Sequence, residues 1–171
     1  MTERADEDVP WLVGAQLEDW KAVMALVTVL PAAMDAQLKR DAGVNLYEYQ
    51  VLAALSERPH GEIPMSDLAR LSGGSPSRLS HAVSRLEDLG WVTRGSCTEA
   101  GKRTSARLTP SGREKLRATA PGHVREVRRL VVDALGPEGF AALARAGRVV
   151  TQVAAPDVAA VLAAPVPTAR G

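Results

Sequence analysis

The sequence predicts a mainly α-helical protein that carries one small β-hairpin. Apolar residues recur at helical spacing near both ends of the chain, where alanine, a strong helix former, is abundant. The middle of the chain holds two short helical segments joined by a Gly-containing turn, and an alternating hairpin pattern follows them. We therefore expect a central lobe with long helices on either side of it.

The composition is that of an ordinary globular protein and excludes several classes. The 171 residues are 46% hydrophobic and 24% charged, which excludes wholesale disorder. No uninterrupted apolar run reaches the roughly 18 residues of a membrane helix, and the acidic start does not resemble a secretory signal. The single cysteine, Cys97, excludes an internal disulfide and a cysteine-based zinc site. We expect a cytoplasmic protein with no membrane contact, metal or cofactor.

The first helical segment is expected over residues 10–43, beginning at Pro10 or Trp11, because proline suits the first turn of a helix. Its apolar residues recur at alternating steps of four and three, which is typical of a helix packed on another helix. Pro31 is expected to kink or split the helix. The apolar seam favours a partner chain, and the interface residues expected from it are Val13, Leu17 and Trp20.

A lobe is expected over residues 44–118, and it opens with a capping box. Asn45 is followed three residues later by Glu48, and the helix that they begin is expected to end near Arg58. A short helix over about 66–72 comes next. A second helix over about 75–89 follows a Gly-Gly turn, with Ser75 as its N-cap and Pro76 as its first residue. Two helices joined in this way are a helix-turn-helix.

The second helix of this pair has an apolar face and a polar face. The polar face offers hydroxyls, an imidazole and guanidiniums, and it lacks acids over its first three turns. A solvated helix usually mixes Glu and Lys instead, whereas these groups suit the base edges and phosphates of a DNA groove. We expect base contacts from Ser77, Ser80, His81 and Ser84, and base or phosphate contacts from Arg78 and Arg85, while Leu79, Ala82, Val83, Leu86 and Leu89 face the core.

Basic charge is concentrated in the middle of the chain. Residues 64–118 hold ten Lys and Arg against five acids, which is compatible with a polyanion-binding surface and, taken alone, with a solvated face. Arg70 and Arg94 are the expected phosphate contacts, and the first backbone N–H groups of the helix near Ser75 can bind a phosphate as well.

A hairpin is expected over about 91–109, with strands over 91–94 and 105–109. A hairpin directly after a DNA-reading helix is a wing, and cations near its tip suit contact with the minor groove or the backbone. The cations that we expect to serve there are Lys102, Arg103 and Arg107.

Residues 119–163 are expected to form C-terminal dimerisation helices. Thr109 and Pro110 begin the helix that leads into them. That helix is expected to kink or break at Pro121, and a stop and restart is expected at Gly136. The interface residues expected here are Phe140, Leu143 and Val150, and the ends of the chain, 1–9 and 164–171, are expected to be disordered tails.

The order of these elements and their local sequences resemble those of the MarR family (multiple antibiotic resistance regulators). The residues that carry the resemblance are M-S-D-L-A-R-L, S-P-S-R-L-S-H-A-V-S-R-L-E-D-L-G-W-V and L-T-P-S-G, within a similarity that spans about residues 12–153. The resemblance implies a homodimer with two winged helix-turn-helix lobes on one palindromic double-stranded operator. It also implies a repressor whose operator binding is relieved by a small, often aromatic or anionic, ligand bound between the dimer helices and the lobe.

One departure concerns the wing. Many family members have an Asp-x-Arg pattern there, whereas this chain reads T-E-A-G-K-R-T. Glu99 could replace the acid and Lys102 or Arg103 the cation, but the spacing differs. This departure concerns the minor-groove contact of the wing and does not affect the recognition helix.

Several residues and functions keep an alternative. Trp20 and Met24 lie where a family ligand pocket could be, although aromatic residues at seam spacing are more often core. Cys97 could make the protein a redox-responsive regulator, but the chain has no second cysteine to resolve a sulfenic acid.

Two other function classes compete with a DNA-binding regulator. A winged-helix module that binds only proteins would present an apolar or acidic recognition helix, and this one is basic and polar. An enzyme is not expected, because the sequence has no G-x-S-x-G, H-E-x-x-H or phosphate-loop motif.

Overall fold

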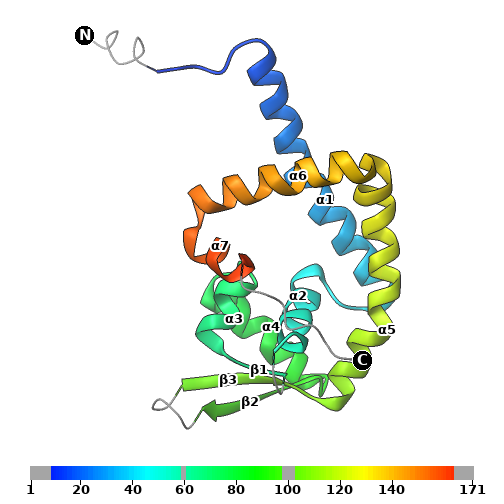
Figure 1. Cartoon of the computed structure of the whole chain (residues 1–171). Helices are drawn as coiled ribbons and strands as arrows, with labels where there is room; N and C mark the ends of the chain where they lie inside the picture. The colour runs from blue at the N-terminus through cyan, green and yellow to red at the C-terminus, as the bar shows by residue number, and fades with distance from the viewer. Residues whose placement is uncertain (1–8, 59–60, 98–102, 164–171) are drawn as a thin grey trace, which may run out of the picture. The chain divides into compact units, whose positions relative to one another are not determined.

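A computed structural model describes residues 9–58, 61–97 and 103–163, and the predicted class, mainly α with a small β-hairpin, is confirmed (Figure 1). The chain divides into two compact units, Met1–Ala33 and Met34–Gly171. The predicted tails over 1–9 and 164–171 lie outside the described residues, apart from Val9. The elements are α1 (Ala15–Ala42), α2 (Leu46–Ser56), β1 (Glu62–Pro64), α3 (Met65–Leu71), α4 (Pro76–Asp88), β2 (Val92–Cys97), β3 (Arg103–Leu108), α5 (Pro110–Val127), the π-helical η2 (Arg128–Val132), α6 (Asp133–Ala154) and α7 (Pro156–Ala163).

Helix α1 begins later than predicted. Gly14 has a φ of +55° and its carbonyl accepts the first helical hydrogen bonds, so the helix starts at Ala15 and not at Pro10 or Trp11. Val13 precedes the helix as a result. Of the two outcomes expected at Pro31, a kink or a split, the split does not occur, because α1 continues through this residue to Ala42. A proline inside a helix removes one backbone hydrogen bond, and a long helix can absorb that loss by bending.

The first part of α1 is apolar on more than one face. The seam residues Leu17, Trp20 and Met24 are exposed, and so are Val23 and Leu26, which lie off the seam. An 18-residue window of α1 has a mean hydropathy of 1.3, so by length and composition alone the helix could cross a membrane. This differs from the sequence prediction, because a window average tolerates the isolated charges that interrupt an apolar run. One such helix near the N-terminus is weak evidence for a membrane span, and a partner helix would cover the same side chains.

The helix-turn-helix is confirmed. The Asn45 side chain accepts a hydrogen bond from Glu48 N at 2.8 Å, and the Glu48 carboxylate accepts one from Asn45 N at 2.9 Å, so the predicted capping box is complete. Helix α2 ends at Ser56, slightly before the predicted Arg58. Helices α3 and α4 follow, and Ser75 caps α4 by accepting from Arg78 N at 3.2 Å.

The core of the lobe lies between α2, α3, α4 and the sheet. Leu79, Ala82, Val83 and Leu86 on α4 are buried, as predicted, against Leu52, Leu55, Leu68 and Val92. Leu89 is 44% exposed, so its predicted place in the core is wrong. It is the C-cap of α4, where the chain leaves the helix and turns at Gly90. Burial of one face therefore leaves the opposite face of α4 toward solvent.

The sheet has three antiparallel strands in the order β1-β3-β2. The predicted hairpin is present as β2 and β3, with Val92 opposite Leu108, and Figure 1 shows it beside α2–α4. Both strands are longer than predicted at their tip ends. Strand β1 was not predicted, because three residues that include a proline leave no alternating pattern. It pairs with β3, with Ile63 opposite Ala106.

The C-terminal helices follow the predicted order with one correction. Thr109 caps α5 by accepting from Gly112 N at 3.0 Å. Of the two outcomes expected at Pro121, a kink or a break, the break does not occur, because α5 continues through this residue. The backbone leaves the helical region at Gly136, as predicted, and α6 resumes after it. No residue of α6 is buried, and Phe140 and Val150 are exposed. This helix has an uncovered apolar surface within the single chain.

Candidate nucleic-acid interface

The polar face of α4 is open to solvent. Ser75, Ser77, Ser80 and His81 are exposed and Ser84 is half-buried, as expected for a helix whose other face is in the core. The flanking Arg78 and Arg85 are exposed as well. The first turn of α4 carries no acid. The side chains that the sequence places in a DNA groove are therefore presented together on one surface.

Arg78 is held at the start of this surface by Tyr47 of α2. Its guanidinium carbon lies 4.3 Å from the centre of the Tyr47 ring, and the Tyr47 hydroxyl is 3.0 Å from Ser72 Oγ. A guanidinium stacked on an aromatic ring keeps its edge free to donate hydrogen bonds. Arg78 is thus oriented without losing the donors that a base or phosphate would need.

Arg85 is engaged within the protein. Its Nε lies 3.3 Å from Glu48 Oε1, and its Nη2 donates to Gly43 O at 3.4 Å. The Glu48 side chain is only 3% exposed, whereas that of Arg85 is 58% exposed. Arg85 ties α4 to the capping box of α2 and keeps part of its guanidinium at the surface.

Arg94 of β2 contacts α4 at several points. Its Nη2 donates to Ser80 O and to Ser84 Oγ, both at 2.9 Å, and its Nε lies 3.3 Å from Glu87 Oε2. Its backbone N–H donates to Glu87 Oε1 at 2.9 Å. Two predicted DNA contacts, Arg94 and Ser84, therefore contact each other.

The remaining predicted cations are distributed around the lobe. Arg70 of α3 lies 3.6 Å from the Asp157 carboxylate of α7, and Arg107 pairs with Glu62, which also accepts a hydrogen bond from Ser105 Oγ at 2.6 Å. Lys102 and most of the wing tip lie outside the described residues. Cys97 ends β2 and Arg103 begins β3, and the structure does not describe their side chains.

Sequence reasoning missed the residues that hold these cations in place. Tyr47, Glu48 and Glu87 lie on different elements from the arginines that they contact, so spacing within one element could not have identified them. A shallow cavity of about 240 Å³ lies between α2 and α4, lined by Asn45, Tyr47, Glu48, Arg78, His81, Ala82 and Arg85. Among the residues that the structure describes, no group of three potential ligands could hold a metal ion.

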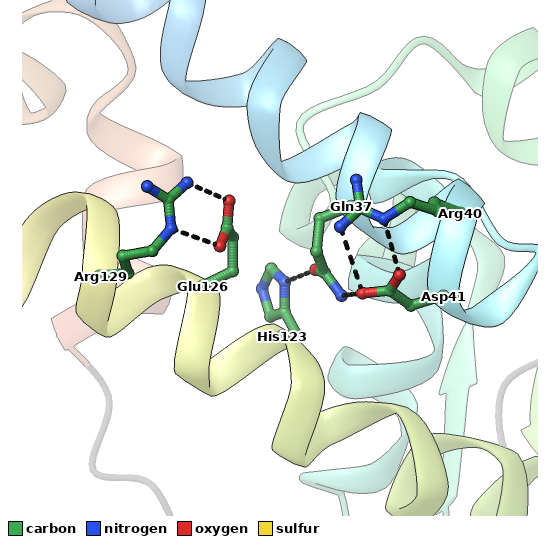
Figure 2. A network of polar contacts seen from close by, with 6 residues as sticks. All are labelled: Gln37, Arg40, Asp41, His123, Glu126 and Arg129. Atoms are coloured by element: carbon green, nitrogen blue, oxygen red, sulfur yellow. Dashed lines mark hydrogen bonds and ion pairs between the residues drawn. The ribbon is translucent and has the colours of Figure 1, made fainter.

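A second polar cluster joins the end of α1 to α5 (Figure 2). The buried Gln37 donates to Asp41 at 3.0 Å and lies 3.4 Å from His123 Nδ1, while Arg40 donates to Asp41 at 2.9 Å. Arg129 of η2 donates to Glu126, which lies on α5 one turn beyond His123. The network lies within the unit Met34–Gly171, whereas the predicted pocket residues Trp20 and Met24 belong to the unit Met1–Ala33 and are exposed there.

Burial and hydrogen bonding shift several pKa values in this cluster. The His123 ring packs 4.5 Å from the Tyr49 ring, and burial lowers the pKa of His123 and raises that of Tyr49. The hydrogen bond from Gln37, followed by those from Arg40, lowers the pKa of Asp41. The cluster therefore holds a neutral imidazole beside ionised carboxylates at neutral pH.

The fold and this surface define a winged helix-turn-helix protein. A sequence model of the MarR family matches residues 42–103, and no curated protein matches the chain. The chain is similar to Sco3205, a MarR family transcriptional regulator from Streptomyces coelicolor whose crystal structure is in complex with DNA. The two are 39% identical, with 89% of this chain and 95% of that chain covered and a TM-score of 0.83.

Two other solved structures are similar over most of the chain. AbsC, a MarR family transcriptional regulator from Streptomyces coelicolor, is 32% identical, with 85% of this chain and 97% of that chain covered and a TM-score of 0.80. Sco5413, from the same organism and family, is 27% identical, with 80% and 95% covered and a TM-score of 0.64. The chain therefore belongs to the MarR family, and it is a transcriptional regulator and not an enzyme.

Proposed function

We propose that this protein binds double-stranded DNA sequence-specifically, as a homodimer on a palindromic operator, and represses transcription there. The observation that carries the proposal is the exposed face of α4, where Ser77, Ser80 and His81 lie beside Arg78 with no acid in the first turn. The 39%-identical relative Sco3205 was crystallised in complex with DNA, which supports the same use of this face.

The proposed contacts divide between base edges and phosphates. Hydroxyl, imidazole and guanidinium groups on α4 can read the hydrogen-bond pattern of the major groove. Arg70 and the wing cations would contact the backbone, which positions a protein on DNA without reading its sequence. The base contacts proposed are Ser77, Ser80, His81 and Ser84 with Arg78, and the backbone contacts proposed are Arg70, Ser75, Arg85, Lys102, Arg103 and Arg107.

The proposed dimer rests on the apolar surface that the single chain leaves open. Leu17 and Trp20 on α1 are exposed, as are Phe140 and Val150 on α6. Exposed apolar residues in such numbers indicate an interface with another protein surface. In this proposal residues 44–118 bind DNA, whereas residues 10–43 and 119–163 pair the two copies. A DNA-binding regulator of this kind would act in the cytoplasm.

The proposed relief of repression by a small ligand requires coupling between a ligand site and the DNA-binding lobes. A ligand releases DNA only if it binds better to a lobe spacing that does not fit the operator, and a coupling of about 1–3 kcal/mol is typical. His123 and Arg40 bring polar and cationic groups to the junction of α1 and α5 (Figure 2). An aromatic or anionic compound is the chemical class that such groups would bind.

The first test is DNA binding across a salt series. The duplex from upstream of this protein's own gene is compared with a random duplex of equal length. We expect tight, selective binding with one dimer per site, and an affinity that falls linearly with salt on logarithmic axes. Equal, weak binding to both duplexes would contradict the proposal and reduce α4 to an electrostatic surface.

The ligand is tested in the same assay. Aromatic carboxylates are added at constant ionic strength to the complex of protein and selected duplex. Release of the duplex should be matched by weaker ligand binding when DNA is present, because coupling between two sites is reciprocal. The loss of duplex affinity should level off at saturating ligand, because the coupling is finite; a loss that keeps growing in proportion to ligand concentration would show simple competition for the DNA surface.

A further inference from the structure

We propose that Arg94 is a positioning residue that locks the wing onto the recognition helix through Glu87, and not a phosphate contact. The proposal rests on the DNA-binding function proposed above. It concerns the junction of α4 with β2, which we call the clamp and define as Arg94, Glu87, Ser80 and Ser84.

One carboxylate holds both the backbone and the side chain of Arg94. Glu87 Oε1 accepts from the Arg94 backbone N–H at 2.9 Å, and Glu87 Oε2 lies 3.3 Å from Arg94 Nε. Hydrogen bonds that involve an ionised partner are stronger than those between neutral groups. The side chains of Arg94 and Glu87 are only 33% and 30% exposed. Every other ion pair among the described residues has at least one partner that is more than half exposed. Both the position and the orientation of Arg94 are fixed by this acid.

The other end of the guanidinium holds the middle of the recognition helix. Arg94 Nη2 donates to Ser80 O and to Ser84 Oγ at 2.9 Å each. Arg94 Nη2 thus binds the backbone carbonyl of Ser80 and the side chain of Ser84, which lies one helical turn further along α4. Since Arg94 lies on β2, which starts the wing, these bonds fix the wing relative to the helix surface that carries Ser77 and His81.

The clamp also closes an open edge of the sheet. Strand β2 pairs only with β3, so its outer backbone groups have no strand partner among the described residues. The Arg94 N–H is one of these groups, and Glu87 satisfies it. Unpaired edge groups otherwise invite pairing with other chains.

The position of Glu87 on α4 indicates that this acid has a structural role. An acid in the last turn of a helix opposes the helix dipole, and near DNA it also repels phosphate. Asp88, the next residue, is an acid at the same helix end, but its side chain is exposed and makes no hydrogen bond or ion pair with the residues that the structure describes. The two acids therefore form a matched pair, one in the clamp and one outside it.

The first experiment compares Glu87→Ala with Asp88→Ala. Both variants remove one negative charge, so simple electrostatics predicts an equal rise in affinity for any duplex. If the clamp positions the wing, Asp88→Ala keeps or raises affinity, whereas Glu87→Ala lowers affinity for the selected duplex about tenfold, the effect of one charge-assisted hydrogen bond. An equal rise in both variants would overturn the proposal.

The second experiment separates positioning from phosphate contact with Arg94→Lys and Arg94→Ala. Lysine keeps the charge but cannot reach Glu87, Ser80 and Ser84 together, so both variants should lose affinity for the selected duplex alike, with the salt slope unchanged. A phosphate contact would instead be rescued by lysine, and alanine would lower the salt slope by about one unit on selected and random duplexes. All variants are compared at a temperature where urea unfolding shows them folded.

A third measurement needs no DNA. Hydrogen exchange of the Arg94 amide should be slow in the unaltered protein and in Asp88→Ala, and at least about tenfold faster in Glu87→Ala. Equal exchange in all three would overturn the clamp whatever the DNA results. If instead the clamp shows this exchange pattern and the unaltered protein prefers no duplex, the proposed function fails and the contact itself stands.

Discussion

The ring of Tyr47 fills the space that a side chain at Gly74 would occupy. A Cβ built at Gly74 would lie 2.2 Å from the Tyr47 hydroxyl oxygen and 2.6 Å from Cζ of the same ring. The ring cannot move away freely, because its hydroxyl contacts Ser72 and its face carries Arg78. The turn between α3 and α4 is therefore built around an aromatic residue from α2.

Gly74→Ala should lower the free energy of unfolding by about 2 kcal/mol or more, as overpacking of a fixed core does. Gly73→Ala is the matched control. Gly73 has a φ of +63° and no atom within 4 Å of its Cβ position, so alanine there costs about 1 kcal/mol of backbone strain. Gly73→Asn should cost less, since asparagine tolerates this conformation. Urea unfolding measures all three, and a Gly74→Ala variant as stable as Gly73→Asn would contradict the packing argument.

Removing the Arg85 side chain should destabilise the lobe. Glu48 is buried and keeps its bond from Asn45 N, but Arg85→Ala leaves its other oxygen without a charged partner. We expect a loss of about 1 kcal/mol in the free energy of unfolding, moderated by the exposure of Arg85. Arg117→Ala, at an exposed position of α5 whose side chain makes no hydrogen bond or ion pair with the residues that the structure describes, is the control. Equal losses in both variants would show that helix propensity and not the ion pair is responsible.

The stability of the protein should fall as the pH decreases from the usual histidine pKa of about 6.5 to the lowered pKa of His123. Burial lowers the pKa of His123, so below its usual value of about 6.5 the unfolded chain takes up a proton that the folded protein declines. Stability is therefore full above that value, falls as the pH decreases, and levels off below the folded pKa. The carboxylates of Asp35 and Asp41, whose pKa values are lowered, titrate below this window.

The measurement is the melting temperature as a function of pH for His123→Asn and for His81→Asn. The His123 variant should lose most of the pH dependence in this window, whereas the His81 variant, altered at an exposed position on α4, should keep it. A pH dependence that disappears only with His81 would place the titrating group outside the cluster.

Charges placed in the α1 seam should abolish dimer formation. Leu17 and Met24 are 38% and 42% exposed in the single chain, and Leu17→Glu with Met24→Glu would bury two carboxylates in the proposed interface at a cost of several kcal/mol. Sedimentation should show monomer or unfolded protein. Lys21→Glu changes the net charge equally at a polar position of α1 and should leave a dimer; a folded, DNA-competent dimer of the double variant would refute the seam.

The sequence predicts elements well where the signal is local. The capping box of Asn45 and Glu48, the Ser75-Pro76 start of α4 and the Thr109-Pro110 start of α5 all lie where the pattern puts them, because each signal is a hydrogen bond within one turn. A helix break, one of the two outcomes expected at each proline, does not occur at Pro31 or Pro121. Pro31 and Pro121 both lie inside continuous helices, since a long helix retains enough other hydrogen bonds to continue through one missing donor.

The candidate site was predicted as a surface but not as a set of contacts. The exposed face of α4 follows from its period, and the buried Leu79 and Leu86 confirm it. The arginines at this surface contact residues of other elements. Arg85 of α4 contacts Glu48 of α2, and Arg94 of β2 contacts Ser84 of α4. Such contacts depend on how the elements pack, which spacing within one segment does not encode.

The π-helical segment Arg128–Val132 has a consequence for how this architecture varies among species. Its hydrogen bonds reach one residue further than those of the α-helices on either side, which is the geometry that a single inserted residue leaves in a helix. The wide turn takes up that residue locally, so the helical residues that follow keep the direction they would have without it. Deleting one codon there would therefore leave a regular helix with nearly the same direction beyond it, whereas deleting one codon from the regular part of α5 would rotate the residues beyond it by about 100°. The segment Arg128–Val132 is thus a point where the chain length can change by one residue while the C-terminal helices keep their direction.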